Sequence, residues 1–329
     1  MINSKANLNP KLFDEDIELK PSRDGYGEGL VIAGEENPNV VALCADLTES
    51  TRTQAFAEKF PQRFFEVGVA EQNLVTTAAG MALGGKIPFT TSYATFSPGR
   101  NWEQIRTTIC YNDVPVKIVG SHAGISVGPD GATHQALEDL AIARALPNMV
   151  VISPADWIEA KKATIAIAKL NKPCYLRLSR DKVSVITTEN TPFEIGKAEI
   201  YSEGTDVAVI ATGQMVYRAL MAAKDMELHK ISVRVINCHT IKPLDKDTIL
   251  KAAQDCGAIV TVEEHQITGG LGGAVAELIS QYFPVPLKII GIEDRFGESG
   301  EPNELLKKFG LTKEAIMKAV TQVLRMKGK

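Results

Sequence analysis

The chain alternates short segments that are apolar throughout with segments whose apolar residues recur every three or four positions. The first pattern is typical of strands buried on both faces, and the second is typical of helices. Buried strands that alternate with helices predict a parallel sheet covered by helices, so the sequence predicts an α/β fold. The expected strands of the first half are 40–47, 87–92, 115–121, 149–153 and 174–179, and the expected helices are 71–84, 100–112, 134–146 and 156–170.

A second series of the same kind follows in the remaining part of the chain. Its expected strands are 207–211, 232–237, 258–263 and 287–293, and its expected helices are 215–229, 245–255, 272–283 and 312–326. The stretch between the two series is rich in Thr, Glu and Gly, which is typical of a linker. We therefore expect a loosely held N-terminal tail at 1–20, an α/β domain at 21–185, a linker at 186–204 and a second α/β domain at 205–329.

Composition excludes several classes of protein. The net charge of −4 and the absence of a basic block argue against nucleic-acid binding. No apolar run approaches the roughly 20 residues that span a bilayer, and the polar, acidic N-terminus is unlike a signal peptide. The five scattered cysteines show neither metal-ligand spacing nor a disulfide framework, which fits reduced core thiols. We therefore expect a cytoplasmic protein that does not bind membranes.

The stretch FFEVGVAEQN at 64–73 places an acidic residue in apolar surroundings. Phe64 and Phe65 predict the end of a short buried strand, Gly68 breaks it, and a helix begins near Ala70. Glu71 thus falls in the first turn of a helix that we expect to be buried on all sides. An acid there complements the helix dipole, but in apolar surroundings it is also a candidate for a raised pKa and a proton-handling role.

Polar and aromatic residues also follow the expected strands of the first domain, at the edge where open α/β sheets bind ligands. They are Asp46 to Ser50, Tyr93, Phe96, His122, Asp130, His134 and Arg180. A single histidine there is more often structural, whereas this concentration of chemical groups predicts a ligand site. The chain has no GxxxxGK[ST] or HExxH motif. The glycine-rich stretch 269–273 matches a dinucleotide loop poorly, and we expect it to let a helix pack closely on the sheet.

The motifs around these residues resemble those of the transketolase family. They are ADLTES at 45–50, GVAEQN at 68–73, Tyr93-x-x-Phe96, GSHAGISVGPDGATHQALEDLA at 120–141, LRLSR at 176–180, TIKPLD at 240–245 and VEEH…GGLG at 262–272. Members of the family have a diphosphate-binding, a pyrimidine-binding and a C-terminal domain. The resemblance implies that the first domain of this chain is the pyrimidine-binding domain and that the second is the C-terminal domain.

The resemblance also implies a cofactor and a reaction. Transketolases transfer a two-carbon ketol (glycolaldehyde) unit from a ketose phosphate to an aldose phosphate through a carbanion of thiamine diphosphate. Glu71 matches the carboxyl that hydrogen-bonds the pyrimidine ring and drives its tautomerisation. Tyr93 and Phe96 match the aromatic pair that packs around the pyrimidine, and Asp46 and Leu47 match cofactor-contacting positions.

For the sugars, the resemblance places His122, Asp130 and His134 around the hydroxyls of the donor ketose. Either histidine could move a proton when the carbon–carbon bond breaks. The positions that match the family's phosphate-binding residues are Arg23, Ser50 and Arg180. His239 and His265 match no such position, and the sequence leaves open whether they are structural or line the outer channel.

The metal-binding segment of the family, a GDG followed by an Asn, is absent from this chain. The resemblance therefore implies a split transketolase in which Mg²⁺ (or Ca²⁺) and the diphosphate are held by a separate N-terminal subunit. A partner of roughly 270–300 residues is expected from ordinary domain sizes. Pairing about a twofold axis would then give an α₂β₂ assembly.

Several alternatives stay open. A transketolase-like enzyme for a specialised sugar is one, because Ala132 stands where the family usually has Pro and Tyr93 replaces a common Phe. A deoxyxylulose-phosphate synthase would resemble DRAG where this chain has SHAG at 121–124. The beta subunit of a 2-oxo acid dehydrogenase lacks the THQ and SHAG pattern. An inactive regulatory partner would have eroded site residues, whereas those named above are all present.

Overall fold

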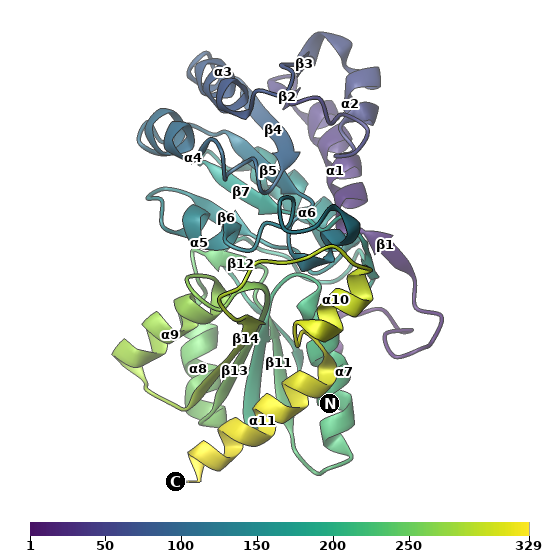
Figure 1. Cartoon of the computed structure of the whole chain (residues 1–329), viewed down its shortest axis with the longest axis vertical. Coiled ribbons are helices and arrows are strands. Elements are labelled where there is room, and N and C mark those ends of the chain that lie inside the picture. Colours follow the sequence, from purple (N-terminus) through teal and green to yellow (C-terminus); the bar gives the residue numbers. More distant parts are fainter. Residues whose placement is uncertain (329) are drawn as a thin grey trace.

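The computed structural model describes residues 1–328. It confirms the prediction of two α/β domains, which lie one above the other along the long axis of the molecule (Figure 1). Within the described residues, no helix combines the length and the apolar character needed to cross a membrane.

The first domain is built on a seven-stranded sheet in the order β12-β6-β7-β5-β4-β2-β3. The strands are β2 (Val40–Cys44), β3 (Phe64–Glu66), β4 (Ile87–Tyr93), β5 (Lys117–Ser121), β6 (Val150–Ile152), β7 (Cys174–Arg177) and β12 (Thr240–Lys242). All neighbours are parallel except β12, which comes from the second half of the chain and pairs antiparallel with β6. The sheet is therefore completed by a strand of the other domain.

Helices cover both faces of this sheet. On one face α1 (Ser22–Glu36) packs against α6 (Trp157–Lys169). The other face carries α3 (Glu71–Leu83), α4 (Trp102–Gln104), which continues into a π-helical turn at Ile105–Cys110, and α5 (Asp139–Arg144). The short helix α2 (Gln54–Lys59) and a 3₁₀ turn at Pro61–Arg63 connect β2 to β3.

Some details of the first domain differ from the sequence-based expectations. Helix α5 begins at Asp139 rather than at residue 134, because the preceding residues form turns and an isolated bridge between Ala136 and Ala123. The strand at 64–66 is an exposed edge rather than a buried strand, with Phe65 38% exposed. Helix α3 is not buried on all sides, since Leu83 and neighbouring residues of one face are exposed.

The second domain contains a five-stranded sheet in the order β14-β13-β10-β11-β9, in which only β9 is antiparallel. Its strands are β9 (Glu199–Ser202), β10 (Val207–Ala211), β11 (Val233–Asn237), β13 (Ile259–Gln266) and β14 (Leu287–Ile292). Its helices are α7 (Met215–Glu227), α8 (Lys246–Cys256), α9 (Leu271–Tyr282), α10 (Pro302–Lys308) and α11 (Lys313–Lys327). Helices α7 and α11 contribute to one apolar cluster and α8 and α9 to another.

The N-terminal segment is anchored, so the expectation of a loosely held tail is wrong. The backbone N–H of Asn3 donates to the carbonyl oxygen of Tyr201 at 3.0 Å, and that of Asn9 donates to Ile186 at 2.9 Å. Leu12 is buried. Strand β1 (Leu19–Pro21) then pairs with β8 (Lys182–Ser184), and Figure 1 shows the N-terminus beside the second domain.

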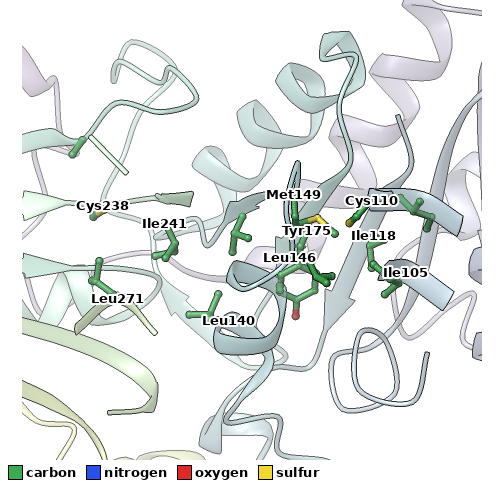
Figure 2. Close-up of a cluster of buried hydrophobic side chains, with 14 of the residues drawn as sticks. Ile105, Cys110, Ile118, Leu140, Leu146, Met149, Tyr175, Cys238, Ile241 and Leu271 are labelled. Atoms are coloured by element: carbon green, nitrogen blue, oxygen red, sulfur yellow. The ribbon is translucent and has the colours of Figure 1, made fainter. Parts of the chain in front are cut away.

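One apolar core runs from the first domain into the second (Figure 2). Ile118 and Tyr175 of the first sheet belong to the same cluster as Cys238, Ile241 and Leu271 of the second half. All five side chains are at most 1% exposed. The two domains are therefore joined by buried apolar surface as well as by the shared sheet.

Candidate active site

Four elements of the first domain bring polar groups together at one edge of its sheet. They are the start of α1 and the segments that follow β2, β4 and β5. This arrangement follows from the fold, because the carboxyl ends of parallel strands meet at the same edge. The side chains of Arg23, Ser50, Tyr93 and His122 form one connected cluster there.

The imidazole of His122 lies at the centre of this cluster. Its ring stacks on Tyr93 with the ring centres 4.0 Å apart. Its Nε2 atom lies 3.1 Å from Arg23 Nη1, and its Nδ1 atom lies 2.9 Å from Ser121 Oγ. A guanidinium can only donate, so Nε2 accepts and the ring proton of a neutral imidazole resides on Nδ1, which donates to Ser121.

Burial, reinforced by the nearby guanidinium groups of Arg23, Arg180 and Arg52, lowers the pKa of His122 to about 2. The imidazole is therefore neutral throughout the physiological pH range. At its Nε2 atom the ring offers an acceptor rather than an acidic proton.

Ser50 and Tyr93 extend the cluster. Ser50 Oγ lies 2.8 Å from the hydroxyl of Tyr93 and 3.3 Å from His122 Nε2. Arg23 Nη1 donates to the carbonyl oxygen of Ser50 at 2.8 Å. The hydroxyl that distinguishes Tyr93 from the phenylalanine common at this position thus has a hydrogen-bonding partner.

Glu71 is the first residue of α3 and is 1% exposed. Its Oε2 accepts from Arg100 Nη1 at 2.8 Å and its Oε1 from Ser92 Oγ at 3.3 Å. The amide of Asn101 donates to the Glu71 carbonyl oxygen at 2.9 Å, which fixes the start of the helix. The Arg100 guanidinium also lies 4.7 Å from the ring centre of Phe96. A buried carboxylate and an aromatic ring thus flank one cation.

The loop between β5 and α5 brings the remaining predicted residues to the same edge. The ring of His134 meets Phe96 edge-on at 5.4 Å, and its Nδ1 atom lies 2.9 Å from Thr133 Oγ1. No other hydrogen bond to this ring occurs among residues 1–328, which leaves Nε2 for a ligand. Asp130 pairs with Arg180 at 3.6 Å.

Asp46 and Leu47 lie apart from the cluster. Asp46 follows β2 with a positive φ of 58°, and its backbone N–H donates to Glu66 Oε1 at 2.7 Å. Within residues 1–328 neither side chain makes a hydrogen bond or ion pair to the cluster around His122. Their cofactor-contacting role stays a prediction.

A pocket of about 540 Å³ opens beside this edge between the two domains. Its basic lining residues are Arg23, Arg52, Arg180 and Lys182, and the second domain contributes Glu301, Pro302 and Asn303. Arg52 is neutralised by Asp24 at 2.7 Å. In contrast, no carboxylate of the described chain lies within ion-pair distance of Arg23, whose Nε atom is buried without a hydrogen-bonding partner. Burial lowers the pKa of Arg23, as expected for an uncompensated cation.

Sequence reasoning missed Arg100, Asn101 and Arg52. A signal for Arg100 existed, because it lies four residues after Phe96 and its backbone N–H bonds to the Phe96 carbonyl oxygen. One helical turn places such residues on the same side. Nothing in the sequence indicated that Arg52 would lie beside Arg23, because their proximity depends on how α1 packs.

His239 and His265 of the second domain are both buried. His239 stacks on Phe193 at 4.4 Å, and burial lowers its pKa to about 3. His265 Nε2 accepts from the backbone N–H of Ala141 at 3.3 Å, across the domain boundary. Both side chains thus pack against or hydrogen-bond to other parts of the protein, which fits a structural role.

The glycine-rich stretch at 269–273 packs as expected. A Cβ atom on Gly272 would lie 2.5 Å from Ile289 Cγ2, so only glycine allows this approach. The N–H groups of Leu271 and Gly272 donate to the buried carboxylate of Glu263 at 2.7 and 2.8 Å. The start of α9 therefore already carries an anion of the protein itself. Across residues 1–328, no group of three or more His, Cys, Asp and Glu side chains is arranged to hold a metal ion.

Comparison with protein families gives two matches that together span most of the chain. Residues 20–185 match the transketolase pyrimidine binding domain, and residues 196–316 match the transketolase C-terminal domain.

Individual proteins agree with this result. The chain is 47% identical to a protein of Methanocaldococcus jannaschii described as a transketolase C-terminal section, over 93% of this chain and 97% of that protein. It is 39% identical to the 6-deoxy-6-sulfo-D-fructose transketolase subunit SqwH of Clostridium sp., over 96% and 98% of the two chains. A solved split gene transketolase, in an inactive beta4 tetramer, superposes with a TM-score of 0.88 at 45% identity, covering 93% of this chain and 99% of that one. This chain therefore belongs to the transketolase family and contains its pyrimidine-binding and C-terminal domains.

Proposed function

We propose that this chain is the C-terminal subunit of a split transketolase, which transfers a two-carbon ketol unit from a ketose phosphate to an aldose phosphate. The observation that carries the proposal is the half-buried guanidinium of Arg23, whose Nε atom is buried without a hydrogen-bonding partner. It has no carboxylate partner in the described chain, and it lines a pocket together with Arg180. A partly buried cation without a carboxylate partner favours an anionic ligand, and a phosphate matches the bidentate geometry of guanidinium groups.

The residues around Glu71 fit the aminopyrimidine of thiamine diphosphate. A buried carboxylate and an aromatic ring that share the contact with Arg100 suit a flat heteroaromatic ring that carries a hydrogen-bonding nitrogen. Glu71 would share a proton with that ring nitrogen, and Arg100, which is half-exposed, would have to yield one carboxylate oxygen. When bound, the cofactor supplies the electron sink for cleavage of the carbon–carbon bond. Tyr93, Phe96, Asp46 and Leu47 are proposed as its further contacts.

The loop residues His134 and Asp130 and the neutral ring of His122 would bind the hydroxyls of the donor ketose. Because burial and the nearby arginines lower the pKa of His122 to about 2, its ring would orient a hydroxyl through Nε2, in place of Arg23, rather than take up its proton. His134, with Nε2 accessible, is the candidate for moving a proton. Ser50, Arg23 and Arg180 would hold the phosphate at the pocket beside this edge.

The diphosphate and its Mg²⁺ would be held by a separate N-terminal subunit. Two relatives support this proposal: one is described as a C-terminal section, and the solved split transketolase is inactive as a tetramer of its beta chains. We propose an α₂β₂ assembly for the active enzyme. The five cysteines in the described part of the chain are all buried and free, which agrees with a reducing cytoplasmic environment.

A second candidate is a transketolase for a specialised sugar. It is favoured by the 39% identity to a subunit that acts on 6-deoxy-6-sulfo-D-fructose. A sulfonate carries one negative charge where a phosphate carries nearly two, so the two substrates place different demands on Arg23 and Arg180.

The test is a ketol-transfer assay with xylulose 5-phosphate and ribose 5-phosphate in the presence of thiamine diphosphate and Mg²⁺. It is run on this chain alone and on this chain co-expressed with the candidate N-terminal subunit. We expect activity only in the pair, and none when the pair carries Glu71→Ala. Activity of the lone chain, or of the Glu71→Ala pair, would refute the proposal. Turnover of the sulfo-sugar but not of xylulose 5-phosphate would establish the second candidate.

A further inference from the structure

The loop at 124–135, here called the donor loop, contains the 3₁₀ segment Ile125–Asp130 and carries both Asp130 and His134. It belongs to the pyrimidine-binding domain, yet the C-terminal domain contacts it at both ends. The inference below rests on the proposed function in one respect, namely that this loop binds the ketose donor.

At the first end, the donor loop is held by Glu264 of β13, whose side chain is only 4% exposed. Glu264 Oε1 accepts from the backbone N–H of Ser126 at 2.7 Å, and Oε2 accepts from the side-chain amide of Gln214. That amide also lies 2.9 Å from Ser126 Oγ. Gly124 has a φ of 89°, and a Cβ atom there would lie 2.3 Å from Glu264 Oε1. The backbone of the loop is thus shaped to admit this carboxylate.

At the second end, the loop rests on the segment that precedes α10. Gln135 Nε2 donates to the carbonyl oxygen of Glu298 at 2.9 Å. A Cβ atom on Gly131 would lie 2.6 Å from Ser299 Oγ, so the two segments are in close contact. The C-terminal domain therefore fixes both limits of the segment between residues 126 and 135.

Val127, the residue after Ser126, connects the contact with Glu264 to Arg180, one of the proposed phosphate-binding residues. The carbonyl oxygen of Val127 accepts from Arg180 Nη1 at 2.5 Å, and Arg180 pairs with Asp130 at 3.6 Å. A loop that loses its hold at Ser126 would also release the acceptor that orients Arg180.

We propose that Glu264 is a positioning residue that fixes the donor loop, so that the C-terminal domain sets the affinity for the ketose phosphate without contributing a catalytic group. This predicts a selective effect on donor binding. In the proposed function the chemical step depends on Glu71, and among residues 1–328 the Glu264 side chain makes no hydrogen bond to that residue.

The experiment measures amide hydrogen exchange of the donor loop in the wild type and in Glu264→Ala, together with donor KM and kcat of the complex with the N-terminal subunit. We expect exchange at 124–131 to quicken about tenfold, which corresponds to one hydrogen bond of about 1.4 kcal/mol. Donor KM should rise by about the same factor while kcat changes less than about threefold. Glu264→Gln keeps one acceptor for Ser126 and should recover most of both effects.

The matched control is Glu277→Ala. It removes a carboxylate that also bridges the two domains, because Glu277 accepts two hydrogen bonds from Arg144. Among residues 1–328, the Glu277 side chain makes no hydrogen bond to the donor loop. It should leave both readouts unchanged. If Glu264→Ala does not yield folded protein, Gln214→Ala tests the same contact more mildly and should quicken exchange in the same segment.

Unchanged exchange at 124–131 in a folded variant would overturn the proposal, as would faster exchange with an unchanged donor KM. The exchange measurement needs no catalytic activity. A wild-type complex without transketolase activity would therefore refute the proposed function, while the exchange result would still decide whether Glu264 holds the loop.

Discussion

The protonation state of His122 is set by its neighbours rather than by its own chemistry. Arg23 on one ring nitrogen and Ser121 on the other leave a single consistent tautomer. Burial and three arginines keep that ring neutral. Because Arg23 has no carboxylate partner among residues 1–328, a ligand group that enters here is expected to bring negative charge or lone pairs.

The most direct test at the scale of single residues is Arg180→Ala. Loss of a charge-assisted hydrogen bond costs roughly 1.5–3 kcal/mol, so KM for phosphorylated donors should rise about tenfold to a hundredfold. The kcat should change far less, because Arg180 lies on the phosphate side of the cluster. Steady-state kinetics with phosphorylated and unphosphorylated donors shows whether the loss depends on the phosphate. An equal loss on an unphosphorylated donor would contradict the assigned role.

At the scale of secondary-structure elements, the sequence predicted the strands and helices whose hydrophobic pattern is regular. Strand β10 matches its expected range, and α3, α6 and α9 match within one residue at each end. Helix α1 was not predicted, because it contains four glycines, which are poor helix formers. Those glycines serve packing: a Cβ atom on Gly25 would lie 1.9 Å from the carbonyl oxygen of Trp157 in α6. That reason is visible only once the two helices are placed together.

The candidate site also has features that the sequence predicts and features that it does not. The sequence indicated which residues gather at the strand ends, because parallel strands bring their carboxyl ends to one edge. It did not indicate that Arg100 pairs with Glu71 or that Tyr93 stacks on His122. Side-chain pairings of this kind depend on loop conformation, which no hydrophobic pattern encodes.

Helix α6 carries a buried pair of carboxyl groups close to the domain boundary, and this pair makes stability depend on pH. Glu159 accepts from Ala155 N at 2.6 Å and from the amide of Asn237 in β11 at 2.7 Å. Burial and the adjacent charge of Asp156 raise the pKa of Glu159 to about 8, from 4.5. The folded protein therefore holds a proton that the unfolded chain releases, so the free energy of unfolding falls as pH rises from 4.5 to about 8.

The corresponding prediction concerns Glu159→Gln, which cannot titrate. The variant should gain in melting temperature relative to the wild type as pH rises from 5 to 8.5, with each kcal/mol shifting the midpoint by about 1–2 °C for a chain of this length. Thermal melts at several pH values measure this difference. Glu277→Gln, at an exposed position, serves as the control and should melt in parallel with the wild type. Parallel curves for Glu159→Gln would contradict the assignment.

At the scale of the whole molecule, the described chain exposes apolar side chains at both ends of α3. Val69 precedes Glu71 by two positions and is 70% exposed, and Leu83 at the other end of α3 is 69% exposed. Exposed apolar groups beside the candidate site are suited to an interface. We expect this surface to contact the N-terminal subunit.

Val69→Asp should therefore weaken assembly with the N-terminal subunit at least about tenfold, since a charge in an apolar interface costs several kcal/mol. The melting temperature of the chain alone should not change. Sedimentation of the mixture and titrated activity measure the loss. Leu228→Asp, which alters an 82% exposed residue after α7 in the other domain, is the control. Equal weakening by both variants would show that the effect is not local to this surface.

The strand β12 limits where a gene for such a protein can be divided. It lies beyond residue 239 in the chain but completes the sheet of the first domain, next to β6. A break between residues 185 and 205 would leave β6 with an unpaired edge and would open the apolar core that Figure 2 shows. The two relatives that match over 97% and 99% of their own lengths keep both domains on one polypeptide. We therefore expect a division of the gene to be tolerated outside this pair of domains and not between them.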